Sequence, residues 1–154
     1  MKIGSLLKKE HIYFDMEAGE KRELIGKMVE ALKSRRVIDR EKLILEALLK
    51  REGLGSTGLE KGIAIPHAIV DEVKEPILAL SVIPEGIDFE AADHLPTYIV
   101  LLLLGSKNNP GNQLKILAHV CRLVKETDVV EKLRAGRNAG EILAILEQEE
   151  EHIE

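Results

Sequence analysis

Apolar side chains recur every three or four residues in several stretches of the chain, which is the spacing of one face of a helix. The first such stretch, from Gly19 to Arg36, predicts a helix with a single buried face. A second helix is predicted from Asp39, a good N-cap residue, to about Arg51. A glycine-rich stretch therefore starts where this second helix ends.

Three more helices are predicted in the last third of the chain. The loop sequence SKNNPGN precedes a long helix. A short helix is expected over Asp128–Ala135, and the capping-box spacing of Asn138 and Glu141 predicts a last helix over Ala139–Leu146. The acidic tail, 147–154, is expected to fray. The expected buried stripe of the long helix consists of Leu114, Leu117, Cys121 and Val124.

Other apolar stretches have the length of strands. Ile77–Ile83 and Tyr98–Leu104 are bounded by Pro and Gly, which is typical of strands in the middle of a covered sheet. Shorter strands are expected at Ile12–Phe14 and Ile63–Ile65, and the segment 84–96 is expected to be an exposed hairpin or excursion. Because strands and helices alternate, the sequence predicts an α/β fold, with one domain over the whole chain and a mixed β-sheet flanked by helices on both faces.

Composition narrows the class of protein. The 154 residues are 45% hydrophobic, enough for one core, and the formal net charge of −5 offers no electrostatic footprint for nucleic acid or an anionic membrane. Aromatic residues make up 3%, so surfaces that stack bases are not expected. A single cysteine excludes an internal disulfide and fits a reducing compartment. The longest apolar run, Ile99–Leu104, is too short to span a bilayer and no signal core is present, so a cytoplasmic protein is expected.

The chemistry of the chain is concentrated in one stretch, REGLGSTGLEKGIAIPH, from Arg51 to His67. Its glycines allow positive φ and bring backbone N–H groups close to a ligand. Ser56 and Thr57 add hydroxyl donors, and Arg51 adds a planar, permanently charged guanidinium suited to phosphate. His67 closes the stretch behind a short apolar run and a proline. Together these residues predict an anion site that contains a nucleophile.

Other interpretations of this stretch exist. The segment 53–58 matches the dinucleotide pattern G-x-G-x-x-G, but that fingerprint requires a strand before it and a helix after it, and here the order is reversed. The stretch has no G-K-[ST] of a nucleotide P-loop, and Leu54 stands where a hydrolase elbow requires glycine. A plain glycine-rich connection is the other possibility, in which Lys50 and Arg51 complement a helix C-terminus. The residues alone leave the anion site and the plain connection both open.

Of the histidines, His67 is the one placed for chemistry, because it lies beside this cluster of donors. Surface positions are expected for His11 and His152 near the termini, for His94 in a polar loop and for His119, which is off the predicted stripe of the long helix. No two histidines are three or four residues apart, so the sequence predicts no metal site.

The sequence GLGSTGLEKGIAIPH closely resembles the phosphorylation-site signature of enzyme IIA domains of the bacterial phosphotransferase system, of the fructose/mannitol and nitrogen-regulatory type. The resemblance covers nearly the whole chain, including DREKLILEALLKRE before the signature, GIDFEAADHLPTYIVLLLL after it and the terminal helices. It implies the mannitol/fructose-type enzyme IIA fold, with the reactive histidine at the edge of the sheet.

By this resemblance, His67 accepts a phosphoryl group from a phosphohistidine on the carrier protein HPr, or on its nitrogen-branch equivalent. It then passes the group to a cysteine of an enzyme IIB domain or uses its phosphorylation state for regulation, and no metal or cofactor is implied. Arg51 matches the phosphate-stabilising arginine of the family. A neutral imidazole is a competent nucleophile, and phosphoryl transfer depends on positioning and charge stabilisation. The residues expected to orient the ring or the phosphoryl oxygens are Gly55, Ser56, Thr57, Gly58 and Gln113.

Two positions depart from the family pattern. Gln113 stands where a second active-site histidine commonly opens the long helix; glutamine can hydrogen-bond a phosphoryl oxygen or the ring of His67, but it cannot become a cation. His94 stands where glycine is usual, and histidine tolerates positive φ better than most residues. Gln113 leaves open a second class of function, a regulatory interaction module with weak or lost phosphorylation. An apolar surface patch for a carrier protein is expected from Ile63, Ile65, Ala68 and Ile69.

Overall fold

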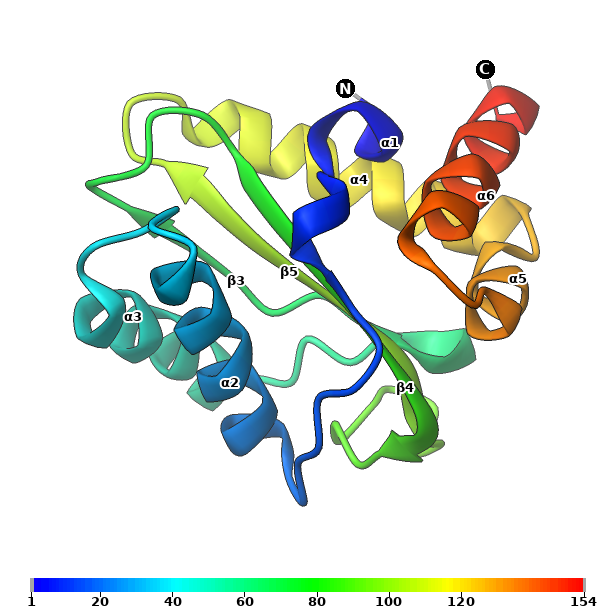
Figure 1. The fold of residues 1–154 in the computed structure, drawn as a ribbon, viewed down its shortest axis with the longest axis horizontal. Helices are drawn as coiled ribbons and strands as arrows, with labels where there is room; N and C mark the ends of the chain where they lie inside the picture. Colours follow the sequence, from blue (N-terminus) through cyan, green and yellow to red (C-terminus); the bar gives the residue numbers. More distant parts are fainter. Residues whose placement is uncertain (1, 154) are drawn as a thin grey trace.

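The structure, a computed structural model, describes residues 2–153, and a mixed β-sheet lies at its centre (Figure 1). Within these residues the strands are β1 (Ile12–Tyr13), β2 (Ile63–Ala64), β3 (His67–Val70), β4 (Ile77–Ile87) and β5 (Thr97–Ser106). The order is β1-β4-β5-β2, and β3 pairs with β5 as well. Strands β4 and β5 are antiparallel, whereas β1, β2 and β3 run parallel to their partners.

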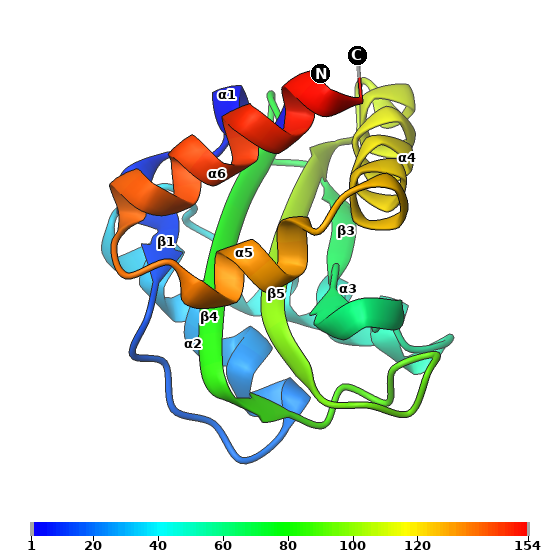
Figure 2. The same ribbon diagram turned by 90° about the vertical axis from the view of Figure 1, so that its right-hand side faces the viewer.

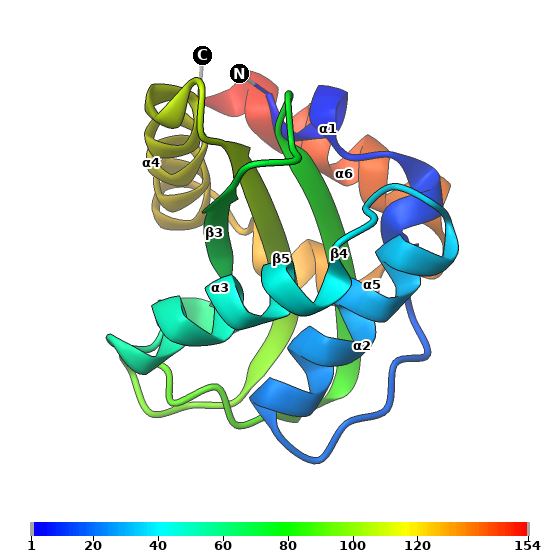
Figure 3. The same cartoon turned by 90° about the vertical axis from the view of Figure 1, so that its left-hand side faces the viewer.

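Helices cover both faces of this sheet. One face carries α2 (Lys21–Ser34) and α3 (Glu41–Gly53), which lie in front of the strands in Figure 3. The other face, seen in Figure 2, carries α1 (Ile3–Leu6), α4 (Pro110–Glu126), α5 (Val129–Ala135) and α6 (Ala139–His152). Short 3₁₀ turns span Lys9–His11 and Glu60–Gly62. The predicted α/β fold, a mixed sheet with helices on both faces, is confirmed.

The sheet divides the hydrophobic core in two because β5 is buried on both of its faces. Side chains alternate along a strand, so Leu102 and Leu104 pack in the cluster under α2 and α3. Leu101 and Leu103 point the other way and pack with Ile116 of α4. A continuous apolar run is therefore what this position requires, and the central strand predicted from that run is confirmed.

The buried face of α4 shares Val124 with the predicted stripe but is otherwise displaced by one residue toward the N-terminus. Leu114 is 69% exposed and Cys121 is also exposed, so the predicted stripe is wrong at both positions. Apolar residues on this helix fit two overlapping stripes of the same spacing, and only contact with the sheet selects between them. The selected stripe, which places a glutamine in the interior, consists of Gln113, Ile116, Val120, Leu123 and Val124.

The acidic tail, 147–154, was expected to fray, and this expectation is wrong for the part that the structure describes, because α6 continues as a helix through most of it. Glu150 is 1% exposed. Its carboxylate accepts the backbone N–H groups of Ile3 at 2.7 Å and Gly4 at 2.8 Å, and it lies 2.6 Å from Nε2 of His119. The first N–H groups of a helix have no partner within the helix, so this buried carboxylate satisfies the start of α1.

Two histidines that were expected on the surface lie partly or wholly inside. His11 is 6% exposed, because the turn that carries it packs against α6. Burial lowers the pKa of His11, and a hydrogen bond with the backbone of Leu78 raises this pKa by less. The ring of His119 is half-buried against Glu150. The surface position predicted for His11 from its place near the N-terminus is therefore wrong, because the last helix covers the N-terminal segment.

The N-cap predicted for α6 is confirmed, whereas the N-cap predicted for α3 is wrong. Asn138 Oδ1 accepts the N–H of Glu141 at 2.9 Å, and the Glu141 carboxylate accepts the N–H of Arg137 at 2.7 Å, so the predicted capping pair does begin α6. Asp39, by contrast, does not cap α3, which begins at Glu41 after a residue that makes no side-chain capping bond.

Candidate functional site

His67 is the first residue of β3, at the edge of the sheet, and its side chain is half-buried. In the parallel register of β3 with β5 it pairs with Leu103, so the two side chains lie on the same face, the one covered by α4. The sequence predicted a strand over Ile63–Ile65 that delivers this histidine. In the structure this segment forms two strands instead of one, because β2 ends at Ala64 and His67 begins β3.

The tautomer of the His67 ring follows from one hydrogen bond. Nδ1 lies 2.7 Å from the carbonyl oxygen of Ile65. A carbonyl only accepts, so Nδ1 carries the proton and Nε2 carries the lone pair. Burial has the largest effect and lowers the pKa of His67, and the positive charge of Arg51 lowers this pKa further, whereas the bond to Ile65 and the negative charge of Glu52 raise it by less. The ring is therefore neutral at neutral pH, with Nε2 as its basic nitrogen.

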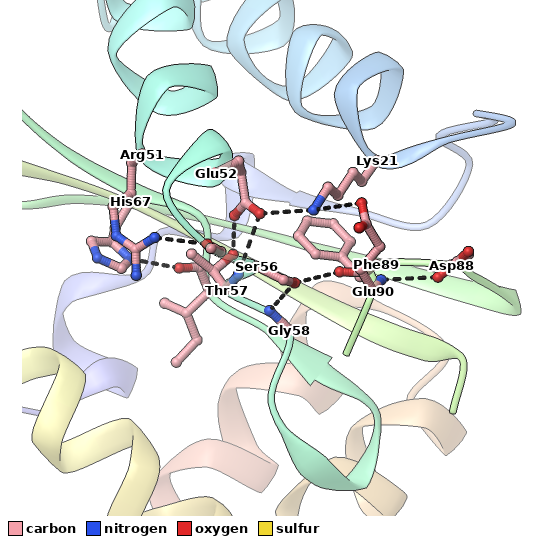
Figure 4. Close-up of polar contacts among 12 residues, drawn as sticks. Lys21, Arg51, Glu52, Ser56, Thr57, Gly58, His67, Asp88, Phe89 and Glu90 are labelled. Carbon is pink, nitrogen blue, oxygen red and sulfur yellow. Dashed lines mark hydrogen bonds and ion pairs between the residues drawn. The ribbon is translucent and has the colours of Figure 1, made fainter. Parts of the chain in front are cut away.

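Arg51, in the last turn of α3, brings a cation to this histidine. Figure 4 shows its guanidinium beside the ring of His67. Arg51 Nη1 donates to the carbonyl of Gly55 at 2.8 Å. Within residues 2–153 the guanidinium makes only this hydrogen bond, so its other N–H groups are available to an anion next to His67. The structure thus brings together the two residues that the sequence selected for catalysis.

The glycine-rich loop after Arg51 is held by Glu52, a residue that the sequence analysis missed. Glu52 is 7% exposed, and its carboxylate accepts both the backbone N–H of Thr57, at 3.2 Å, and the Thr57 hydroxyl. Lys21 of α2 donates to the same carboxylate at 3.2 Å. Charge alone did not distinguish this glutamate from its neighbours in the sequence. Its role becomes visible only because the chain turns back and brings Thr57 into hydrogen-bonding contact with its carboxylate (Figure 4).

The other hydroxyl of the loop also has protein partners. Ser56 Oγ donates to the carbonyl of Phe89 and accepts the N–H of Gly58 at 3.0 Å. A side chain at Gly58 would meet the backbone of Ala91 at 2.9 Å, so only glycine fits this approach. Both hydroxyls that were expected to orient a phosphoryl group therefore hold the loop itself together in this state.

The segment 84–96, expected to be an exposed excursion, is exposed only in part. It closes the antiparallel hairpin of β4 and β5, but Phe89 within it is fully buried. Lys21 Nζ lies 3.2 Å from Glu90 and 5.6 Å from the centre of the Phe89 ring, so the segment is tied to α2. His94 is exposed with a φ of 61°, which confirms the positive φ expected there.

Gln113 lies in the first turns of α4 and is 6% exposed. A Cβ at Gly105 would fall 2.3 Å from its Oε1, so the amide lies directly over this glycine. Gly105 pairs with Ile69 of β3, two residues beyond His67 and on the same face. Oε1 has no hydrogen-bond partner among the residues that the structure describes. An unpaired amide oxygen thus lies over the central strand β5, on the same face of the sheet as the histidine.

Residues 5–149 match the family described as "Phosphoenolpyruvate-dependent sugar phosphotransferase system, EIIA 2". The chain belongs to this family. The chain is similar to curated relatives of both the nitrogen-regulatory and the fructose-specific type. The "Nitrogen regulatory protein" of Bradyrhizobium diazoefficiens is 37% identical over 106 residues, which are 69% of this chain and 69% of that protein. The "PTS system fructose-specific EIIA component" of Haloferax volcanii is 37% identical over 116 residues, 75% of each chain.

Some relatives of this enzyme IIA chain are much longer. The "PTS system fructose-specific EIIABC component" of Bacillus subtilis is 30% identical over 148 residues, which are 96% of this chain but 23% of that protein. The match to this relative therefore concerns one part of a larger protein.

Solved structures of enzyme IIA proteins have the same fold. Nitrogen regulatory protein IIA-Ntr from Neisseria meningitidis is 33% identical, with a TM-score of 0.85 over 94% of this chain and 98% of that one. IIA mannitol from Escherichia coli is 26% identical, with a TM-score of 0.75 over 91% of this chain and 98% of that one. The mannitol/fructose-type fold expected from the signature is therefore confirmed.

The surface of this enzyme IIA around His67 differs from the expected apolar patch. Ile63, Ile65 and Ala68 are buried because they pack into the two halves of the core, and only Ile69 is exposed, at 41%. The patch expected from these residues is wrong. The other large apolar side chains that are exposed within residues 2–153 are those of Leu54, Leu114, Leu95 and Leu43. Within residues 2–153, no helix combines the length and hydropathy needed to cross a membrane, and no three metal-ligating side chains cluster.

Proposed function

We propose that this enzyme IIA is a phosphocarrier in which Nε2 of His67 accepts a phosphoryl group from a phosphohistidine on an HPr-type carrier protein. The observation that carries the proposal is the 2.7 Å contact between Nδ1 and the Ile65 carbonyl, because it leaves the lone pair on Nε2. Membership of the phosphotransferase system family supports the same chemistry. A cytoplasmic location, expected from the sequence, stays a prediction.

The residues around the ring suit such a transfer. As the N–P bond of the donor breaks, a new P–N bond forms at Nε2, and the His67 ring becomes more positive. The Ile65 carbonyl, which accepts from Nδ1–H, stabilises that developing positive charge. The free N–H groups of Arg51 stabilise the negative oxygens of the phosphoryl group as it passes. Positioning and charge supply the catalysis, and no step requires a metal.

The onward step has two supported forms. One solved structure with the same fold is the complex of enzyme IIA mannitol and phosphorylated enzyme IIB mannitol from Escherichia coli, which supports onward transfer to an enzyme IIB. The nitrogen regulatory relatives support use of the phosphorylation state as a signal. We propose that His67 serves either output, since both begin with the same phosphorylated ring.

A second candidate function is a regulatory interaction module in which phosphorylation is weak or lost. The observation that favours it is Gln113, a buried amide at the position where the family commonly has a second histidine. An amide cannot supply the positive charge that an imidazolium would give to a phosphoryl group. The two candidates differ in one measurable property, the rate of phosphorylation.

The deciding experiment is the intact mass of the protein after incubation with phosphoenolpyruvate, enzyme I and the carrier protein, for wild type and His67→Ala. We expect one acid-labile phosphoryl group on wild type alone, with a His67→Ala variant that is folded by circular dichroism. Nuclear magnetic resonance of the product should show substitution at Nε2; substitution at Nδ1 would contradict the tautomer argument. A folded wild type that both HPr and its nitrogen-branch equivalent leave unmodified would favour the interaction module.

A further inference from the structure

Glu52 follows Arg51 directly in the chain, and its buried carboxylate lies against Thr57 of the glycine-rich loop (Figure 4). Its side chain is 4% exposed, and burial of a charge is costly unless the charge is paired and hydrogen-bonded. Lys21 pairs with it at 3.2 Å, and Thr57 gives it a backbone N–H and a hydroxyl. The carboxylate is therefore fully satisfied by an arrangement that connects α2, the end of α3 and the far end of the glycine-rich loop.

This arrangement closes the loop at its two ends, where Glu52 and Thr57 meet. Between them, a Cβ at Gly53 or Gly55 would meet nothing within 4 Å, and Leu54 is 81% exposed. Packing therefore does not fix the middle of the loop. Its shape depends on the contacts at its ends, on the hydrogen bonds of Ser56 with Phe89 and Gly58, and on short turns such as that from the Gly55 N–H to the Glu52 carbonyl, at 3.2 Å.

The guanidinium of Arg51 is docked on this same loop. Its hydrogen bond to the Gly55 carbonyl, at 2.8 Å, is the contact that fixes its direction beside His67. A long, flexible side chain acts efficiently in a transfer reaction only when its geometry is held in advance. A path of contacts thus runs from Glu52 through Thr57 and the loop to Arg51.

We infer that Glu52 and Thr57 form a clamp that positions Arg51 against His67, and that both are positioning residues for phosphoryl transfer. The inference rests on the proposed function, because it assigns the pair a role in that reaction. Neither residue touches the phosphoryl group, since both side chains are buried and bonded to one another. The clamp acts on the reaction only through Arg51.

The first test compares two substitutions of Thr57. Thr57→Val keeps the volume but removes the hydroxyl that binds Glu52, whereas Thr57→Ser keeps the hydroxyl. We expect Thr57→Val to slow phosphoryl acceptance on the order of ten-fold, and Thr57→Ser to stay close to wild type. Glu52→Gln is a second variant in case Thr57→Val is poorly folded, because it keeps an acceptor and removes the charge that binds Lys21. Equal rates for Thr57→Val and wild type would overturn the clamp.

The second test asks whether the effect passes through Arg51. In an Arg51→Ala background we expect Thr57→Val to cause no further loss of rate, because there is no guanidinium left to position. A full additional loss in that background would show a merely structural role and would overturn the inference.

A third measurement does not depend on phosphoryl transfer. The positive charge of Arg51 lowers the pKa of His67, so release of the guanidinium by Thr57→Val should raise that pKa, and only when Arg51 is present. A pH titration of the His67 ring by nuclear magnetic resonance measures this in the unmodified protein. An unchanged titration would contradict the clamp, whereas absence of phosphorylation in wild type would contradict the proposed function alone.

Discussion

Two buried carboxylates organise opposite parts of this molecule. Glu52 joins the end of α3 to a loop, and Glu150 joins α6 to the start of α1 and to His119 of α4. Both accept backbone N–H groups, and both lie beside a basic side chain. Glu150 acts between helices that are packed on the core, whereas Glu52 holds a loop whose middle is open to solvent. One kind of interaction thus joins packed helices in one part of the molecule and, by our inference, positions Arg51 in the other.

The largest effect that would test this comparison is the loss of stability in Glu150→Ala. The substitution leaves two N–H groups of α1 without their buried acceptor, so we expect a loss of about 3 kcal/mol in the free energy of unfolding. Urea denaturation measures this, with the exposed neighbour Glu151→Ala as a control that should stay close to wild type. A Glu150→Ala protein that is as stable as Glu151→Ala would refute a stabilising role for Glu150.

Unlike Glu150→Ala, which should lower stability, Arg51→Ala is expected to lower the rate of phosphoryl acceptance. It removes the guanidinium that we propose stabilises the phosphoryl oxygens, so we expect acceptance to slow by about 100-fold while stability changes little. Rapid-quench measurements with the phosphorylated carrier give the rate. Lys50→Ala, on the previous residue and exposed, is the matched control. An Arg51→Ala variant that accepts the phosphoryl group at the wild-type rate would rule out this role.

The fall of the acceptance rate at low pH gives a second test of the role of Arg51. Acceptance requires a neutral His67, and burial and the charge of Arg51 lower its pKa, so the rate should stay high until the pH falls below about 6.5. Without the guanidinium the pKa rises, and the fall in rate should begin at a higher pH. The pH dependence of acceptance in wild type and Arg51→Ala checks this. Coincident acid limbs would mean that Arg51 does not act on the ring.

Protonation should also affect stability at the end of the molecule far from the site. Burial lowers the pKa of His11 in the folded protein, so its neutral form contributes stability that is complete above about pH 6.5 and is lost as the pH falls through the folded-state pKa. His11→Gln should remove part of this acid sensitivity. Denaturation curves of both proteins above and below that pH measure it, and parallel losses of stability on acidification would contradict it.

The smallest effect is expected from Gln113→His. An imidazole at this position could gain a positive charge near the phosphoryl group, so we expect acceptance to become roughly three-fold faster. Asn112→His, on the preceding residue, is the control. Equal rates for Gln113→His and wild type would mean that the amide has no kinetic consequence and would remove the main support for the interaction module.

The sequence predicted the features that depend on residues close together in the chain. The stretch from Arg51 to His67 was recognisable because its glycines, hydroxyls and charged groups follow one another directly. The Glu52–Thr57 contact was missed because its geometry depends on a turn whose course no local pattern specifies. The contact of Glu150 with Ile3 spans 147 positions of the chain, so no local periodicity could indicate it.

The phase of α4 was missed for a different reason. Its apolar residues fit two overlapping faces, but the face that packs on the sheet also includes a polar residue, Gln113. Hydrophobic spacing alone therefore favoured the stripe that contains Leu114, which the structure exposes at 69%. Tertiary packing decided between two helical patterns of similar strength.

The acceptor that fixes the His67 tautomer is a main-chain atom, the carbonyl oxygen of Ile65. The bend beside it is held by another main-chain contact, in which the Leu103 N–H donates to the Pro66 carbonyl at 2.9 Å. No exchange of the Ile65 side chain deletes that oxygen. Substitutions of the Ile65 side chain therefore leave this acceptor in place, so relatives of this chain could acquire new partners and still keep Nε2 as the nitrogen that we propose accepts the phosphoryl group.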